Sequence, residues 1–162
     1  MEYWDAYDRE GHRTGQTLIR GEAIPKGLFH LVCDVLVQHT DGDYLLMRRS
    51  PLKPNHPDRD EASAGGSALL GEDPLHCAQR ELLEETGLSG GTFTELGRYC
   101  DGRHTHYVSY LYTTDAPKDA IRLQEGETVG YRWISPDQFR AFIHSSRAIP
   151  SQAQRLLRHL AL

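Results

Sequence analysis

The 162-residue chain lacks the long apolar runs and the surplus of basic residues that mark several common classes of protein. No apolar run approaches the roughly 18 residues needed to cross a bilayer. Residues 1–10 show no signal-peptide pattern, so we expect a soluble cytoplasmic protein without a membrane partner. The formal net charge is −5. General nucleic-acid binders and membrane-surface binders carry a basic patch, so a net negative charge argues against both classes of protein.

Cysteine is also scarce. Cys33, Cys77 and Cys100 form an odd, scattered set without a C-x-x-C pair, which argues against a zinc or disulfide framework and predicts reduced thiols. Internal repeats and low-complexity segments are missing as well. A chain of this length without a long linker is predicted to form one domain over residues 1–162, with a single core.

The clearest element in the sequence is a short helix over residues 74–86. Asp73 is a good N-cap, Pro74 is tolerated in a first helical turn, and Gly87 supplies a left-handed stop. At about 100° per residue, one side of this helix is predicted to face the core. That side carries Leu75, Ala78, Leu82 and Thr86.

The same helix carries three carboxylates near its C-terminus, Glu81, Glu84 and Glu85. Like charges three or four residues apart cost a helix roughly 0.2–0.5 kcal/mol per pair, and acids in the last turns also oppose the helix dipole. A solvated acidic face is the common explanation for such a cluster. We favour a divalent cation, because it would convert this repulsion into ligation by oxygen.

The stretch from Gly66 to Leu88, GSALLGEDPLHCAQRELLEETGL, resembles the Nudix box, G-x5-E-x7-R-E-U-x-E-E-x-G-U, in which U is aliphatic. Every specified position of the motif is filled. A chance match at so many fixed positions is very improbable. The matching residues are Gly66, Glu72, Arg80, Glu81, Leu82, Glu84, Glu85, Gly87 and Leu88.

The resemblance implies an α+β fold, namely a Nudix-type α/β/α sandwich with a mixed β-sheet. It also implies hydrolysis of a small-molecule nucleoside diphosphate derivative, by attack of water on phosphorus with Mg²⁺ or Mn²⁺ as cofactor. The metal ligands it implies are the carboxylates of Glu81, Glu84 and Glu85 with the carbonyl of Gly65. Within the box, Glu72 and Arg80 are expected to orient Glu81, and Gly66 is expected to be a structural residue.

The general base is left open between Glu127, Glu84 and Glu81, in that order. Glu127 is a candidate because Nudix domains often place a glutamate several residues before a tryptophan, here Trp133. Substrate contacts are expected from one arginine of the strand over residues 44–50 and from basic residues of the proline-rich loop 51–61. These candidates are Arg49, Lys53 and Arg59, although a solvated loop is the alternative for the last two.

Strand patterns surround the box. Residues 28–37 and 44–50 are predicted to pair through a turn at Asp41-Gly42, and residues 93–100 are predicted to pair with 105–114. Residues 1–27 are predicted to form a strand or hairpin that covers the domain, with aromatic residues in a lid or a homodimer contact. Helices are expected from Pro136 to about Ile143 and over the amphipathic tail 150–162, with Arg155 on its polar face.

Two other functions stay open. The opening third and the segment RRSPLK more loosely resemble the isopentenyl diphosphate isomerase-like subgroup, but the segment before the box, DEASAGG, lacks the cysteine that these isomerases carry there. A non-catalytic Nudix-like domain that senses a nucleotide is the second alternative. Such domains usually have a degraded box, whereas this box is intact.

Overall fold

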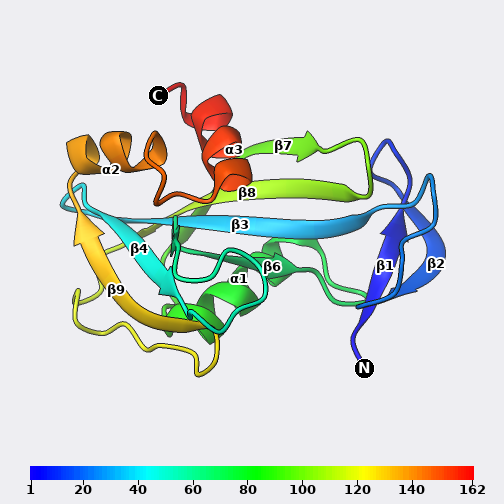
Figure 1. Ribbon diagram of the computed structural model, residues 1–162, viewed down its shortest axis with the longest axis horizontal. Helices are drawn as coiled ribbons and strands as arrows, with labels where there is room; N and C mark the ends of the chain where they lie inside the picture. Colours follow the sequence, from blue (N-terminus) through cyan, green and yellow to red (C-terminus); the bar gives the residue numbers. More distant parts are fainter.

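The computed structural model describes all residues from Met1 to Leu162 and contains one seven-stranded mixed sheet with helices on both faces (Figure 1). The main path of the sheet is β5-β4-β3-β8-β7, with β6 paired to β3 and β9 paired to β4. Strands β3 and β8 run parallel, and the other neighbours are antiparallel. The predicted α+β sandwich is therefore confirmed.

The chain forms twelve elements, of which the short strands β5 and β6 lie where a loop was predicted. The elements are β1 (Tyr3–Tyr7), β2 (Arg13–Ile19), β3 (His30–His39), β4 (Tyr44–Arg49), β5 (Asp60–Glu61), β6 (Ala64–Ser67), α1 (Pro74–Thr86), β7 (Thr92–Cys100), β8 (Thr105–Thr114), β9 (Thr128–Ile134), α2 (Pro136–Ile143) and α3 (Pro150–Leu160).

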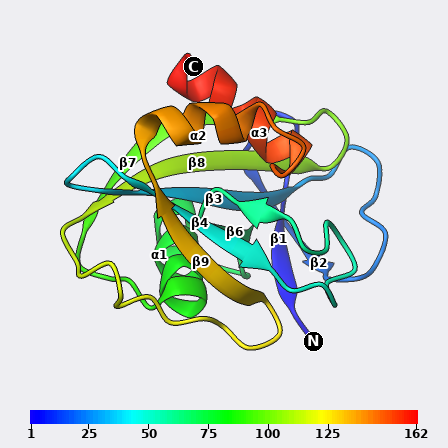
Figure 2. The same ribbon diagram turned by 60° about the vertical axis from the view of Figure 1, so that its left-hand side comes forward.

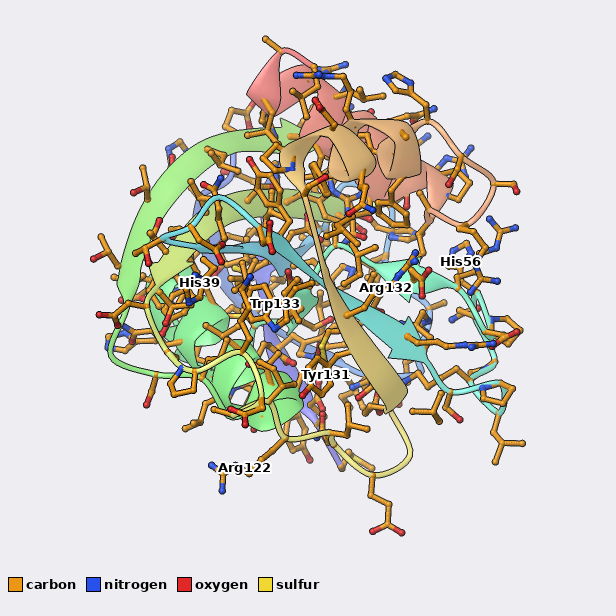
Figure 3. The ribbon with its side chains drawn as sticks, turned by 90° about the vertical axis from the view of Figure 1, so that its left-hand side faces the viewer. His39, His56, Arg122, Tyr131, Arg132 and Trp133 are labelled. Carbon is orange, nitrogen blue, oxygen red and sulfur yellow. The ribbon has the colours of Figure 1, made fainter.

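Two apolar layers lie on opposite faces of the sheet. Because side chains alternate along a strand, Leu45 and Met47 of β4 pack on the face covered by α1, whereas Leu46 packs on the face covered by α2 and α3 (Figures 1 and 2). Strand β9 alternates in the same way. Trp133 lies against the α1 layer, while Arg132 projects to the other side of the strand (Figure 3).

The predicted hairpin of β3 and β4 is confirmed only next to its turn, where Gln38 pairs with Tyr44. Beyond that point β4 pairs with β9, and β3 pairs with β6. Strand β6 needs glycine there, because a Cβ on Gly65 would lie 2.6 Å from the carbonyl oxygen of Cys33. The two strands therefore diverge, and the glycine loop of the box enters the sheet between them.

Helix α1 has the predicted ends. The Asp73 side chain accepts a hydrogen bond from the backbone N–H of His76, and Gly87 has a φ of +76°. The predicted core face was wrong at Leu75, which is 40% exposed. Its place is taken by Cys77, and the buried side also includes Glu85. A carboxylate thus lies on the packed side of this helix.

Helix α3 docks on the sheet through a buried ion pair. The prediction placed Arg155 on the polar face of the helix, and this was wrong, because Arg155 donates to both carboxylate oxygens of Asp34 at 2.8 and 3.0 Å. Ser109 also donates to Asp34 at 3.3 Å. Aspartate in the middle of β3 therefore has a structural partner that is far away in the sequence.

The N-terminal cover is the predicted hairpin, formed by the antiparallel strands β1 and β2. It joins the domain at the bridge between Tyr7 and Phe29 and through Trp4, whose ring stacks on His30 at 4.4 Å between centroids. All three cysteines are free thiols. None of the helices has the length and apolar character required to cross a membrane.

Candidate active site

Arg80 is the hub of the polar residues on α1. Its Nε and Nη2 bind the two carboxylate oxygens of Glu72 at 2.6 and 3.0 Å, and Nη2 also donates to the carbonyl of Ser67 at 3.1 Å. The opposite edge of the guanidinium, Nη1, donates to Glu81 at 2.9 Å and to Glu84 at 3.3 Å. Arg80 therefore ties the glycine loop to two of the three clustered carboxylates.

Glu81 lies directly against the loop. Its side chain is 14% exposed, compared with 44% for Glu84. A Cβ added at Gly66 would overlap the Glu81 carboxyl group, so glycine is required where the loop passes this side chain. Burial raises the pKa of Glu81, and the neighbouring Arg80 offsets part of this increase.

Glu85 is the most unusual carboxylate of the site. The residue is only 7% exposed, and its Oε2 is buried without any hydrogen-bond partner. Burial raises the pKa of Glu85 well above its ordinary value, and repulsion from Glu61 and Glu81 raises it further. A buried carboxylate without a partner is costly, so this atom requires either a proton or a cation.

The residues present fit a divalent cation. The side-chain donors are carboxylate oxygens, as hard cations prefer, and the partnerless Oε2 of Glu85 lies in the same cluster as Glu81. No three side chains are already arranged as a ready-made cation site. The physical reason is that Arg80 holds oxygens of Glu81 and Glu84, so a cation would have to compete with this arginine for them.

Glu61 is a member of the site that the sequence reasoning missed. It lies in β5, its carboxylate forms an ion pair with Arg49, and both side chains are partly buried, at 13% and 15% exposed. Burial raises the pKa of Glu61 despite this cationic partner. Its repulsion of Glu85 places it beside the cluster. No periodicity could have identified it, because a two-residue strand in a proline-rich loop has no recognisable pattern.

The remaining candidates fall into two places. Lys53 forms an ion pair with Glu127, whose charge also repels Glu85, so this pair lies at the rim of the site. Arg59 instead donates to the carbonyls of Ser146 and Ala148, in the connection before α3. Gly65 lines a small cavity of about 170 Å³ together with Gly66 and Glu61.

The fold and the acidic helix behind a glycine loop define a Nudix-type domain, and comparison with known proteins agrees. The model of the NUDIX domain matches residues 28–156. An uncharacterized Nudix hydrolase of Listeria monocytogenes is 31% identical over 153 residues, which covers 93% of this chain and 89% of the relative. The chain therefore belongs to the Nudix hydrolase family and is an enzyme of that family.

Solved structures share the fold at lower sequence identity. A crystal structure from Deinococcus radiodurans has a TM-score of 0.80 at 20% identity and covers 98% of this chain and 99% of its own. An Ap4A hydrolase of C. elegans has a TM-score of 0.57 at 18% identity, covering 82% of this chain and 98% of its own. A bifunctional NMN adenylyltransferase/ADP ribose pyrophosphatase of Francisella tularensis has a TM-score of 0.62 at 19% identity, covering 86% and 42%. These likenesses concern the fold alone.

The contact between Gly66 and Glu81 gives a first prediction. Replacing Gly66 with alanine should displace the Glu81 carboxylate from the loop, because the new methyl group would occupy its position. We expect kcat to fall about 100-fold, the scale on which a small misplacement of a catalytic group acts. Steady-state kinetics with a circular dichroism melt would measure this. Gly130→Ala is the matched control, since a Cβ there meets nothing within 4 Å; equal losses in both variants would contradict the explanation.

Proposed function

We propose that this Nudix hydrolase uses Mg²⁺, or Mn²⁺ in its place, to cleave a diphosphate linkage in a nucleoside diphosphate derivative, by attack of water on phosphorus. The observation that supports this most directly is the buried, partnerless Oε2 of Glu85 beside Glu81 and Glu61. A cation would neutralise this cluster and could at the same time bind phosphate oxygens.

The residues proposed to hold the ion are Glu81, Glu84 and Glu85, with the carbonyl of Gly65. When bound, the ion supplies Lewis-acid polarisation of the diphosphate and lowers the pKa of water. Arg80 keeps Glu81 oriented through its bonds to Glu72 and to the loop. We propose this orienting role because one guanidinium links both carboxylates.

Glu127 remains our first candidate for the general base, ahead of Glu84 and Glu81. Its carboxylate is held by Lys53 at the rim of the acidic cluster. A base there would accept the proton of the attacking water once a substrate phosphate competes for Lys53. Lys53 and Arg49 are the proposed cationic contacts for phosphate oxygens, because both lie beside acidic residues of the site. Arg59, in the loop before β5, is proposed to contact the substrate farther from the acidic cluster than Lys53 and Arg49 do.

A panel of diphosphate compounds tests the proposed function. We expect hydrolysis of at least one nucleoside diphosphate derivative with Mg²⁺, loss of turnover in EDTA, and recovery when Mg²⁺ or Mn²⁺ is added back. Reaction in ¹⁸O-labelled water should place the label on a phosphate product, because water attacks phosphorus. Turnover that is unaffected by EDTA would overturn the role of the metal.

The same panel separates the two alternatives. Tight nucleotide binding without any product would favour the sensor. Uptake of deuterium from solvent into isopentenyl diphosphate would favour the isomerase, since a hydrolase exchanges no carbon-bound proton. Cys33 and Cys77 are fully buried, so neither thiol is placed to reach such a substrate.

A further inference from the structure

Two adjoining cavities run from the acidic cluster to the far end of α3. The first, of about 170 Å³, is lined by Glu61, Gly65 and Gly66 and also by Ser151 and Arg155 of α3. The second, of about 410 Å³, shares Ser151 and Arg155 with the first. Its lining comes from α3, from β7 and β8 and from the turn that joins these two strands; Figure 1 shows where these elements lie. Because both cavities are lined by Ser151 and Arg155, they lie next to each other along α3.

The larger cavity is built from arginine and tyrosine. The guanidinium of Arg155 lies over the ring of Tyr107 at 3.8 Å, and that of Arg158 lies over Tyr99 at 4.8 Å. A guanidinium stacked on an aromatic ring keeps the N–H groups of its edge available for hydrogen bonds. The guanidinium groups already cover one face of each tyrosine ring. The cavity therefore offers N–H donors to a ligand, and little free aromatic surface on which a nucleobase could stack.

The cavity also has more positive than negative charge available to a ligand. Arg103 and Arg158 make no ion pair, and neither side chain donates a hydrogen bond within the protein. Arg155 is neutralised by Asp34 through Nε and Nη2, but its Nη1 has no partner. The one other carboxylate, Asp101, accepts three backbone N–H bonds through Oδ1, from residues 103, 104 and 105, at 2.8–3.0 Å. Burial opposes ionisation of Asp101, but these bonds hold its pKa below the usual range, so it stays a single negative charge among the arginines. They also fix the turn that carries Arg103.

We propose that this arginine-tyrosine cavity binds a second phosphate of the substrate, a phosphate monoester separate from the diphosphate that is cleaved. Arg158 and Arg103 are the specificity-determining residues, and Arg155, which lines both cavities, lies between the two sites. Phosphate is the anion that fits, because planar guanidinium groups bind it through paired charge-assisted hydrogen bonds. This inference rests on the proposed diphosphate hydrolysis and narrows its substrate class to phosphorylated nucleoside diphosphate derivatives.

Matched substrates that differ by one phosphate test the inference. ADP-ribose is compared with ADP-ribose 2′-phosphate, and dephospho-coenzyme A with coenzyme A, so that the additional phosphate lies on the 2′ or the 3′ oxygen. In at least one pair we expect the phosphorylated compound to have a kcat/KM about tenfold higher, mainly through KM, as one charge-assisted hydrogen bond would give. In Arg158→Glu this ratio should fall to near one. Arg140→Glu, an equal charge change on exposed α2, should retain it.

A binding measurement without catalysis separates this inference from the proposed function. The Nε–H signals of arginine are followed by NMR while inorganic phosphate is added in EDTA. We expect the signals of Arg103 and Arg158 to shift and saturate, that of Arg140 to stay, and the shift at Arg103 to be lost in Arg158→Glu. If these shifts occur but no diphosphate is hydrolysed, the proposed function fails and the phosphate site stands. Hydrolysis with a ratio near one in both pairs, or unshifted signals at Arg103 and Arg158, overturns the phosphate site.

Discussion

Replacing Glu85 with glutamine is expected to reduce Mg²⁺-dependent turnover by about 10³-fold, the scale seen when one preorganised electrostatic group is removed from an active site. Glutamine keeps the shape of the side chain but supplies no negative charge to a cation. The Oε2 that has no partner in the protein would become a neutral amide group. Steady-state kinetics at saturating Mg²⁺ would measure the loss in kcat.

The same substitution should stabilise the metal-free protein, with a definite pH dependence. The folded pKa of Glu85 is raised above its ordinary value of 4.5. Below pH 4.5 both folded and unfolded chains hold the proton, so wild type and Glu85→Gln should melt alike. As the pH rises above this value, the unfolded chain ionises first, and folding is penalised in the wild type alone. The melting temperature of the variant in EDTA should therefore exceed that of the wild type above pH 4.5, by an amount that grows with pH until the folded carboxyl group ionises as well.

Added metal should reverse this order. A ligand that binds only the folded state stabilises it by about 2.7 kcal/mol at 100 times its dissociation constant, and this gain should be present in the wild type and small in Glu85→Gln. Glu95→Gln is the matched control, since Glu95 is exposed on β7 and paired with Arg98. Near-normal activity of Glu85→Gln with an unchanged melting curve would remove the basis for the proposed site.

Local chemistry made α1 predictable. Its ends depend on Asp73 and Gly87, which act within one helical turn, so residues next to one another in the sequence were sufficient. The periodicity also placed Glu81 and Glu85 near each other. It was wrong at Leu75, because the packed side of the helix is set by where β3 and β6 lie, and sequence periodicity does not report their position.

The pairing of distant segments determined what the sequence could not predict. Glu61 joins the site only because β5 pairs with β4 and Arg49 faces it. Lys53 meets Glu127 across 74 positions of sequence. Strand β4 was predicted to pair along β3 because a turn joins them, yet its long partner is β9. Long-range contacts of this kind leave no periodic pattern in either partner.

The largest expected effect on stability is at the ion pair of Asp34 and Arg155. Their side chains are only 9% and 8% exposed, and the bond is bidentate. Replacing Arg155 with methionine leaves Asp34 buried without its charge partner, which typically costs about 3–5 kcal/mol. For a chain of this size, we expect the melting temperature to fall by about 10 °C. Urea unfolding and calorimetry would measure both quantities.

A second substitution distinguishes the lost ion pair from lost packing. In Asp34→Leu with Arg155→Met both charges are gone, and replacement of a whole buried pair by apolar residues is often neutral or stabilising. The double variant should therefore recover most of the stability lost by Arg155→Met alone. Arg140→Ala, at an exposed pair with Asp137, should change stability by less than about 0.5 kcal/mol. If the double variant were as unstable as the single one, the stacking of Arg155 on Tyr107 would be what holds α3 on the sheet, and the charge pair would be secondary.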